Sequence, residues 1–299
     1  MSKRKQISDQ DTGHRKRATT PVPRNTTQET ALAFRISNIP SGVDPCLFRQ
    51  SLDRMPDDTS LSGAVGGEPN VLGWSFARSV ASIDAERYRT ITVTFRSIPN
   101  QFRFPETFNS VALIENSPPV IVDKHFYGLT PLNFPEKPTV DIVAVTGLAG
   151  HAFGSWKSRG GSAMWLRDFL PEYVPNARIL TYGYDSTLFK NNSTASIHEF
   201  SRNFLEALNS ARAEAEETFG VWKQTEPKVL MVSRDSAIDA TPEGDQNDIF
   251  SIDANHSNIV KFKHNACPDY LNVRSRIITL VQNAPVVISK RSANRIAGT

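Results

Sequence analysis

The sequence has only two cysteines, Cys46 and Cys267, among its 299 residues, which is too few for a disulfide framework and gives no metal-site spacing. It has no apolar run near the ~18 residues that a membrane-spanning helix needs. The N-terminus lacks the apolar core of a secretory signal peptide, so we expect an intracellular, cytoplasmic protein with no transmembrane segment. The sequence contains neither the dinucleotide-binding motif G-x-G-x-x-G nor the Gly-Lys-Ser/Thr of a P-loop. We expect no metal and no cofactor.

The basic excess is confined to the N-terminal segment. Residues 1–24 hold seven Lys and Arg and two Asp, which leaves 27 of the 34 basic and 29 of the 31 acidic residues for the remainder. The remainder is therefore close to neutral, and its charge does not indicate a nucleic-acid-binding surface. Residues 1–30 are polar and predict a disordered tail, whose two basic clusters leave nuclear entry open as an alternative role.

Residues 31–137 predict a small α+β module with the order strand, helix, strand, strand. We expect strands at residues 31–39 and 88–95, and a helix that begins at Pro45 after an Asp44 cap. This order resembles the ferredoxin-like fold of RNA-recognition motifs, and residues 37–39 match the end of that family's first signature. Arg35, Thr90 and Thr92 occupy positions where that family carries stacking aromatics, so we do not expect specific RNA binding. An interaction or packing role fits the module better.

Residues 138–289 predict an α/β domain, because apolar strands alternate with helices. The strands are expected at residues 140–145, 177–182, 228–232 and 248–252, and the helices at 162–170, 196–217 and 269–282. The predicted fold class is therefore a doubly wound, mostly parallel sheet, with the ferredoxin-like module as a smaller N-terminal domain. Residues 290–299 are expected to form a second disordered tail.

A glycine-containing turn, Gly147 to Gly150, follows the first of these strands. Three interpretations remain open from the residues alone: a phosphate cradle, an oxyanion hole of the α/β-hydrolase type, and a plain tight turn.

Four stretches together carry a resemblance to a known family: VDIVAVTGLAGHAFGSW (140–156), MWLRD (164–168), residues 179–185, and DANHSNIVKF (253–262). They resemble fungal α/β-hydrolase domains of the esterase or lipase type, related to serine-active-site proteins and found at the N-terminus of NACHT-containing, receptor-like proteins. The resemblance covers about half of the chain, and an RNA-recognition-like unit also precedes such domains.

The resemblance implies roles for particular residues. Gly147, Leu148, Ala149 and Gly150 correspond to the family's oxyanion loop, with Thr146 where the family usually has histidine. His256 matches its catalytic histidine, and Asp235 an acidic residue that would orient the imidazole.

The nucleophile is missing, because the sequence contains no G-x-S-x-G motif. The segment that would carry it is absent between Glu217 and Trp222, and Ser233 is a weak substitute without flanking glycines. The sequence therefore predicts an inactive hydrolase relic that serves as an interaction or sensing module, with a protein partner and a lipid or ester ligand as candidates. An active serine esterase with an atypical nucleophile is the alternative. Peripheral association with the mitochondrion or endoplasmic reticulum is an alternative location.

Overall fold

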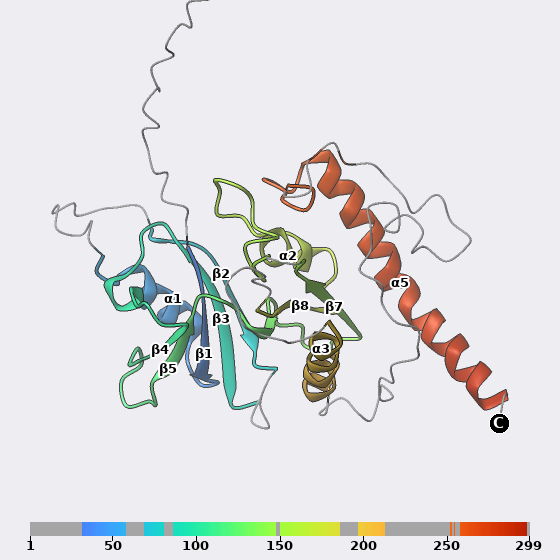
Figure 1. Cartoon of the computed structure of the whole chain (residues 1–299), viewed down its shortest axis with the longest axis horizontal. Coiled ribbons are helices and arrows are strands. Elements are labelled where there is room, and N and C mark those ends of the chain that lie inside the picture. The colour runs from blue at the N-terminus through green and yellow to red at the C-terminus, as the bar shows by residue number, and fades with distance from the viewer. Residues whose placement is uncertain are drawn as a thin grey trace, which may run out of the picture.

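The computed structural model describes residues 32–57, 69–80, 86–147, 150–185, 197–212, 252, 254 and 258–297. These residues form two β-sheets with helices around them (Figure 1). Sheet A has the strand order β2-β3-β1-β5-β4, and sheet B has the order β6-β8-β7.

Sheet A comes from the N-terminal part of the chain, and all of its strands pair antiparallel. Its elements are β1 (Ala33–Pro40), α1 (Pro45–Asp53), β2 (Val71–Arg78), β3 (Tyr88–Phe95), the 3-10 helix η2 (Asn100–Phe102), β4 (Phe108–Val111) and β5 (Val120–Asp123). The strands predicted at residues 31–39 and 88–95 are confirmed as β1 and β3. After β3 the chain forms only the short η2, which begins directly after Pro99, because proline disfavours a longer helix there.

Helix α1 begins where the sequence predicts it. The Asp44 carboxylate accepts a hydrogen bond from the Leu47 backbone N–H at 2.9 Å, and Pro45 occupies the first helical position. Phe48 and Leu52 are buried and pack against sheet A. Helix α1, capped by Asp44 and apolar along one side, therefore covers one face of this sheet.

The two faces of sheet A differ in what covers them. On one face Phe34, Ile36 and Ile91 belong to an apolar core. On the other face, Thr92 and Thr94 are fully buried. There Arg167 Nη1 donates to Thr94 Oγ1 at 3.2 Å, and Arg35 Nη1 donates to Thr130 Oγ1 at 2.8 Å. The polar face is therefore packed against the C-terminal part of the chain.

Sheet B carries the remaining strands and most of the helices. Its elements are β6 (Gly128–Pro131), β7 (Val140–Val145), α2 (Trp165–Asp168), the 3-10 helix η3 (Leu170–Glu172), β8 (Ala177–Gly183), α3 (Ile197–Arg212) and α5 (Pro268–Ala297). Strands β7 and β8 pair parallel, whereas β6 pairs antiparallel with β8. Strand β6 lies before the boundary expected at residue 137 and nevertheless belongs to sheet B.

Both faces of sheet B are covered. Ile142 and Ile179 face a core that includes α2 and the first half of α5, with Trp165 and Tyr270 at its centre. On the opposite face, Leu180 and Tyr182 pack against Phe204, Leu208 and other residues of α3. Apolar residues on both sides of β7 and β8 explain the near-continuous hydrophobic runs in their sequences.

Helix α5 is longer than the predicted helix at residues 269–282. It continues through Pro285 to Ala297, across residues that were expected to form a tail. Its second half extends away from the two sheets (Figure 1), and Leu280 and Val286 are exposed.

The predicted fold class is wrong. The larger sheet is entirely antiparallel, and only one of the two pairings in the small sheet B is parallel, so the described residues do not form a doubly wound, mostly parallel sheet with a ferredoxin-like domain beside it. A short apolar run does not indicate whether a strand pairs parallel or antiparallel with its neighbours. In addition, the sequence does not predict β6 as a strand. The strand predicted at residues 228–232 lies outside the described residues, as does the strand predicted at 248–252 except for Ile252.

Candidate functional site

The predicted catalytic residues are not part of the described structure. His256, Asp235 and Ser233 lie outside the described residues, as do Leu148 and Ala149 of the predicted oxyanion loop. Gly147 and Gly150 are described, and they lie directly after the carboxyl end of β7.

The described residues that follow β7 hydrogen-bond to one another. The Gly150 N–H donates to the Gly147 carbonyl at 3.0 Å, and the His151 N–H donates to Ser155 Oγ at 3.2 Å. The hydroxyls of Thr146 and Ser155 lie 2.9 Å apart. A Cβ at Gly150 would overlap the Thr146 hydroxyl, so this close approach requires glycine. The N–H group of Gly150, which belongs to the predicted oxyanion loop, is therefore already engaged, as is that of the neighbouring His151.

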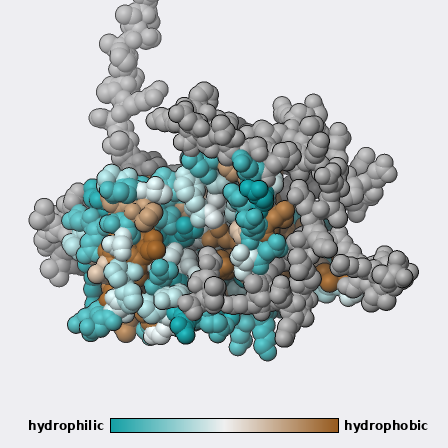
Figure 2. All heavy atoms as spheres, turned by 60° about the horizontal axis from the view of Figure 1, so that its bottom comes forward, coloured by the Kyte–Doolittle hydropathy of each residue, from teal (hydrophilic) through white to brown (hydrophobic). Residues whose placement is uncertain are grey.

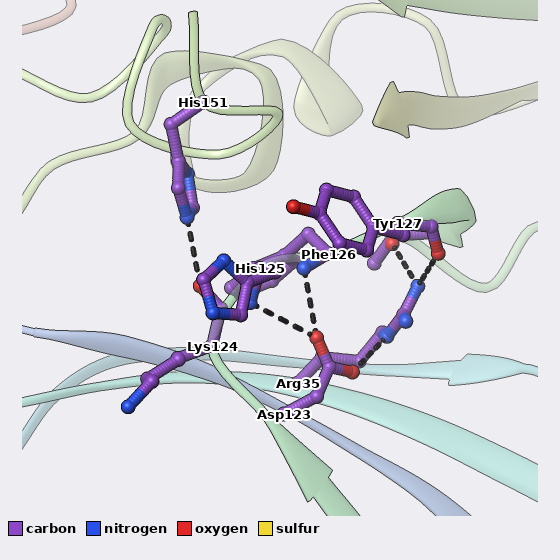
Figure 3. Close-up of polar contacts among 8 residues, drawn as sticks. Arg35, Asp123, Lys124, His125, Phe126, Tyr127 and His151 are labelled. Atoms are coloured by element: carbon purple, nitrogen blue, oxygen red, sulfur yellow. Dashed lines mark hydrogen bonds and ion pairs between the residues drawn. The ribbon is translucent and has the colours of Figure 1, made fainter. Parts of the chain in front are cut away.

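His151 joins this loop to the turn after β5 (Figure 3). Its Nδ1 lies 2.9 Å from the Gly154 backbone nitrogen and 3.2 Å from that of Phe153, so Nδ1 accepts from both N–H groups. The proton must then be on Nε2, which donates to the Lys124 carbonyl at 2.7 Å. Both ring nitrogens are engaged, and the imidazole is held in its neutral form.

The protonation of His151 is disfavoured. Partial burial of the ring lowers the pKa of His151 below its ordinary value, an effect that the bond to the Lys124 carbonyl partly offsets. The nearby His125 lowers this pKa further, and Asp123 raises it. Sequence reasoning missed His151, although it directly follows the glycine turn.

Asp123 holds the turn that connects sheet A to β6 (Figure 3). Its Oδ2 accepts from Arg35 Nε at 2.6 Å, and its Oδ1 accepts from the backbone N–H of Phe126 at 2.7 Å. Arg35 Nη1 also donates to the Tyr127 carbonyl at 2.9 Å. Phe126 has a φ of 59°, a left-handed conformation that costs roughly 1–2 kcal/mol and that these charge-assisted bonds stabilise. Arg35 therefore joins the two sheets, at the position where RNA-recognition motifs carry a stacking aromatic.

A cavity of about 470 Å³ lies beside this turn, and we call it the basic pocket. Its lining comes from the start of β1, the turn after β5, the loop 151–160 and the segment before α5. The lining residues are Leu32, Ala33, Phe34, Lys124, His125, His151, Phe153, Gly154, Lys157, Ser158, Arg159, Gly160 and Lys261. Its described lining includes Lys124, Lys157, Arg159 and Lys261 and no aspartate or glutamate.

Lys157 and Lys124 occupy different environments in this lining. Burial lowers the pKa of Lys157, and the positive charges of Arg167 and Lys261 lower it further. The Lys124 ammonium is bound to Phe104. Its Nζ donates to the Phe104 carbonyl at 2.9 Å and lies 5.4 Å from the centre of the Phe104 ring.

No group of three or more His, Cys, Asp or Glu that could hold a metal ion occurs in the described ranges. No described helix combines the length and the apolar character needed to cross a bilayer.

Comparison with protein-family models, with curated proteins and with solved structures finds no match to this chain.

Proposed function

We propose that this chain is a protein of the serine esterase or lipase type that does not hydrolyse esters and that acts as an interaction or sensing module. Its place in the cytoplasm and its action through a protein partner belong to the same proposal. The proposal begins from the resemblance of the segments around β7 and β8 to that family and from the absence of G-x-S-x-G from the sequence.

The hydrogen bonds of Gly150 and His151 after β7 are the observation that carries the proposal. An oxyanion hole works only when preorganised donors point at the position of the developing charge, and one such donor contributes roughly 10²–10³-fold in kcat. Here the N–H groups of Gly150 and His151 already donate within the loop. An ester bound at this edge of sheet B would compete with those bonds.

A second observation opposes a catalytic role for the histidine at this edge. The ring nitrogens of His151 are both engaged with backbone groups, so the residue is not available as a general base. The parallel pair of β7 and β8, with a glycine loop at the carboxyl end of β7, still supports relationship to the hydrolase type.

The surface supports an interaction role. Figure 2 shows apolar patches within a largely hydrophilic face. Large apolar side chains are exposed on several elements: Leu47, Phe108, Phe134, Leu280, Val286, Val287 and Ile288. Exposed apolar patches in soluble proteins commonly mark contact sites.

The test is hydrolysis of p-nitrophenyl butyrate, together with labelling by a fluorophosphonate probe that reacts only with an activated serine. We expect equal, near-background rates and no labelling for the full chain and for Ser233→Ala and His256→Ala. Ser41→Ala, at an exposed turn of sheet A, is the matched control, and an active serine esterase is the positive control. A burst in the wild type that is lost in both Ser233→Ala and His256→Ala would overturn the proposal and identify Ser233 as the nucleophile.

A further inference from the structure

The apolar stripe of α5 continues beyond the core that the first half of this helix helps to form. Val273, Ile277 and Val281 pack against that core, and they follow one another along one side of α5 at about one helical turn. Ala284 and Ile288 come next on the same side, because residues three or four positions apart share a helix face. Ile288 is nevertheless 45% exposed. The stripe therefore leaves the core after Val281 and reaches the surface.

Further aliphatic side chains are exposed around this end of the helix. Leu280, Val286 and Val287 are 60%, 55% and 43% exposed. Leu280 and Val287 are seven positions apart and lie beside the stripe. Val286, Val287 and Ile288 are consecutive, and successive residues of an α-helix are rotated by about 100°, so together they cover most of the circumference. Figure 1 shows this half of α5 extending away from both sheets.

The sequence of this end of α5 is basic. Residues 280–299 contain Lys290, Arg291 and Arg295 and no aspartate or glutamate, which gives a formal charge of +3. The acidic residue nearest before them is Asp269, in the first turn of the helix. Exposed aliphatic residues followed directly by basic residues are typical of helices that bind the surface of an anionic bilayer.

We propose that the second half of α5 binds the surface of a lipid bilayer that contains anionic lipids. Leu280, Val287 and Ile288 enter the boundary between the headgroups and the acyl chains, and the positive charge of residues 290–295 is attracted to the anionic headgroups. Burial of aliphatic surface favours binding to any bilayer, whereas the charge selects an anionic one. This proposal does not depend on whether the chain hydrolyses esters.

Two other occupants fit this surface less well. A second copy of the chain would bring the same three basic residues, and the added positive charge would oppose self-association. A groove in a protein partner would contact one side of the helix and leave either Val286 or Ile288 in water. Protein interfaces also depend mainly on Trp, Tyr and Arg anchors, whereas the large exposed apolar residues here are all aliphatic. Fluid acyl chains can surround aliphatic groups on several sides of a helix.

The experiment is co-sedimentation of the full chain with vesicles of phosphatidylcholine alone and with vesicles that also contain about 30% phosphatidylserine. We expect half of the protein to bind at roughly 0.1–1 mM lipid of the anionic vesicles, and binding to phosphatidylcholine alone to be at least about tenfold weaker. Raising the NaCl concentration from about 0.05 M to about 0.5 M should weaken binding to the anionic vesicles. The basic residues of the N-terminal segment also attract these vesicles, so variants are needed to locate the contact.

An apolar variant separates α5 from the N-terminal segment. The double variant Val287→Gln, Ile288→Gln removes aliphatic groups at exposed positions without changing the charge, and it should weaken binding to the anionic vesicles about tenfold. Leu47→Gln is the matched control, since Leu47 is an exposed aliphatic residue of α1, and it should bind like the wild type.

A charge variant tests the second half of the proposal. The double variant Lys290→Gln, Arg291→Gln should weaken binding to the anionic vesicles about tenfold. Lys3→Gln with Arg4→Gln removes the same charge from the N-terminal segment and is the matched control, for which we expect a smaller loss.

Four results would overturn the proposal. They are no binding to the anionic vesicles, equal binding to phosphatidylcholine alone, and a loss in either α5 variant that does not exceed the loss in its matched control. The fourth is a dimer, detected by light scattering, that the apolar variant dissociates, because this surface would then belong to a second copy. Circular dichroism of each variant separates a lost contact from a lost fold, and the charge variant keeps the test valid if the apolar variant does not fold.

Discussion

Replacing Arg167 by methionine removes a deeply buried charge between the two sheets while keeping an apolar chain of similar length. The Arg167 side chain is 1% exposed, and its Nε and Nη2 donate to the two Asp168 carboxylate oxygens at 2.6 and 3.0 Å. Its Nη1 donates to Thr94 on sheet A, and the guanidinium lies 5.2 Å from the centre of the Phe153 ring. The variant breaks all four contacts.

The expected loss in the free energy of unfolding depends on the environment of the Asp168 charge that remains. Breaking a buried ion pair usually costs about 3–5 kcal/mol, because the remaining charge is left without its partner. Asp168 is 22% exposed and still accepts from the Met164 N–H at 2.7 Å, so its charge is partly solvated and partly satisfied. We therefore expect the free energy of unfolding to fall by about 3 kcal/mol, at the lower end of that range. Asp168→Asn in the Arg167→Met background should recover part of the loss, because it removes the unpaired charge.

Urea unfolding of the full chain, followed by far-ultraviolet circular dichroism, measures the change. Arg78→Met is the matched control, since the Arg78–Glu86 pair is largely exposed and an exposed pair contributes roughly 0–1 kcal/mol. If Arg167→Met costs no more than Arg78→Met, or if Asp168→Asn adds to the loss in the double variant, the reasoning is refuted.

Three further predictions concern His151, Tyr270 and the face of sheet A that carries Arg35. The pKa of His151 lies below the ordinary 6.5, so the unfolded chain binds this proton more readily than the folded one. Stability should therefore be lost as pH falls below about 6.5, and His151→Gln should reduce the fall in the urea midpoint between about pH 7.5 and pH 5.5; an unchanged fall would contradict this. Burial raises the pKa of Tyr270 to about 12, and its buried hydroxyl has no hydrogen-bond partner among the described residues. Tyr270→Phe should thus leave the free energy of unfolding unchanged or raise it by up to ~1 kcal/mol, whereas a loss above ~1 kcal/mol in urea unfolding would reveal a partner. The chain without residues 1–30 should not bind single-stranded RNA, because the face of Arg35, Thr90 and Thr92 is packed against sheet B and lacks stacking aromatics; micromolar binding at physiological salt would contradict this.

The sequence predicts the local elements well where a local signal is strong. The Asp44 cap with Pro45 locates the start of α1, and the apolar runs locate β7 and β8. The stripe of α3, with Phe204, Leu208 and Ala211, is also confirmed by the core that it forms. Each of these signals depends on residues close together in the chain.

What the sequence does not predict depends on partners far away in the chain. Arg35 was interpreted as a missing aromatic, whereas it binds Asp123 and Thr130, about 90 positions later. The basic pocket likewise gathers residues from Leu32 to Lys261, and no spacing motif connects them. Strand β6 is only four residues long and includes Pro131, so its sequence carries little strand signal.

The position of β8 in the middle of sheet B sets the order in which this part of the protein can form. Strands β6 and β7 both hydrogen-bond to β8, which is the last of the three to leave the ribosome. Until Gly183 has been synthesised, β6 and β7 have neither this partner nor each other, and their edges are open to pairing with another chain. High sequence separation between β6 and β8 also slows folding, because the intervening loop must close before any contact stabilises it. A chain that stops before β8 should therefore aggregate as it is made, whereas one that stops after Gly183 can complete sheet B.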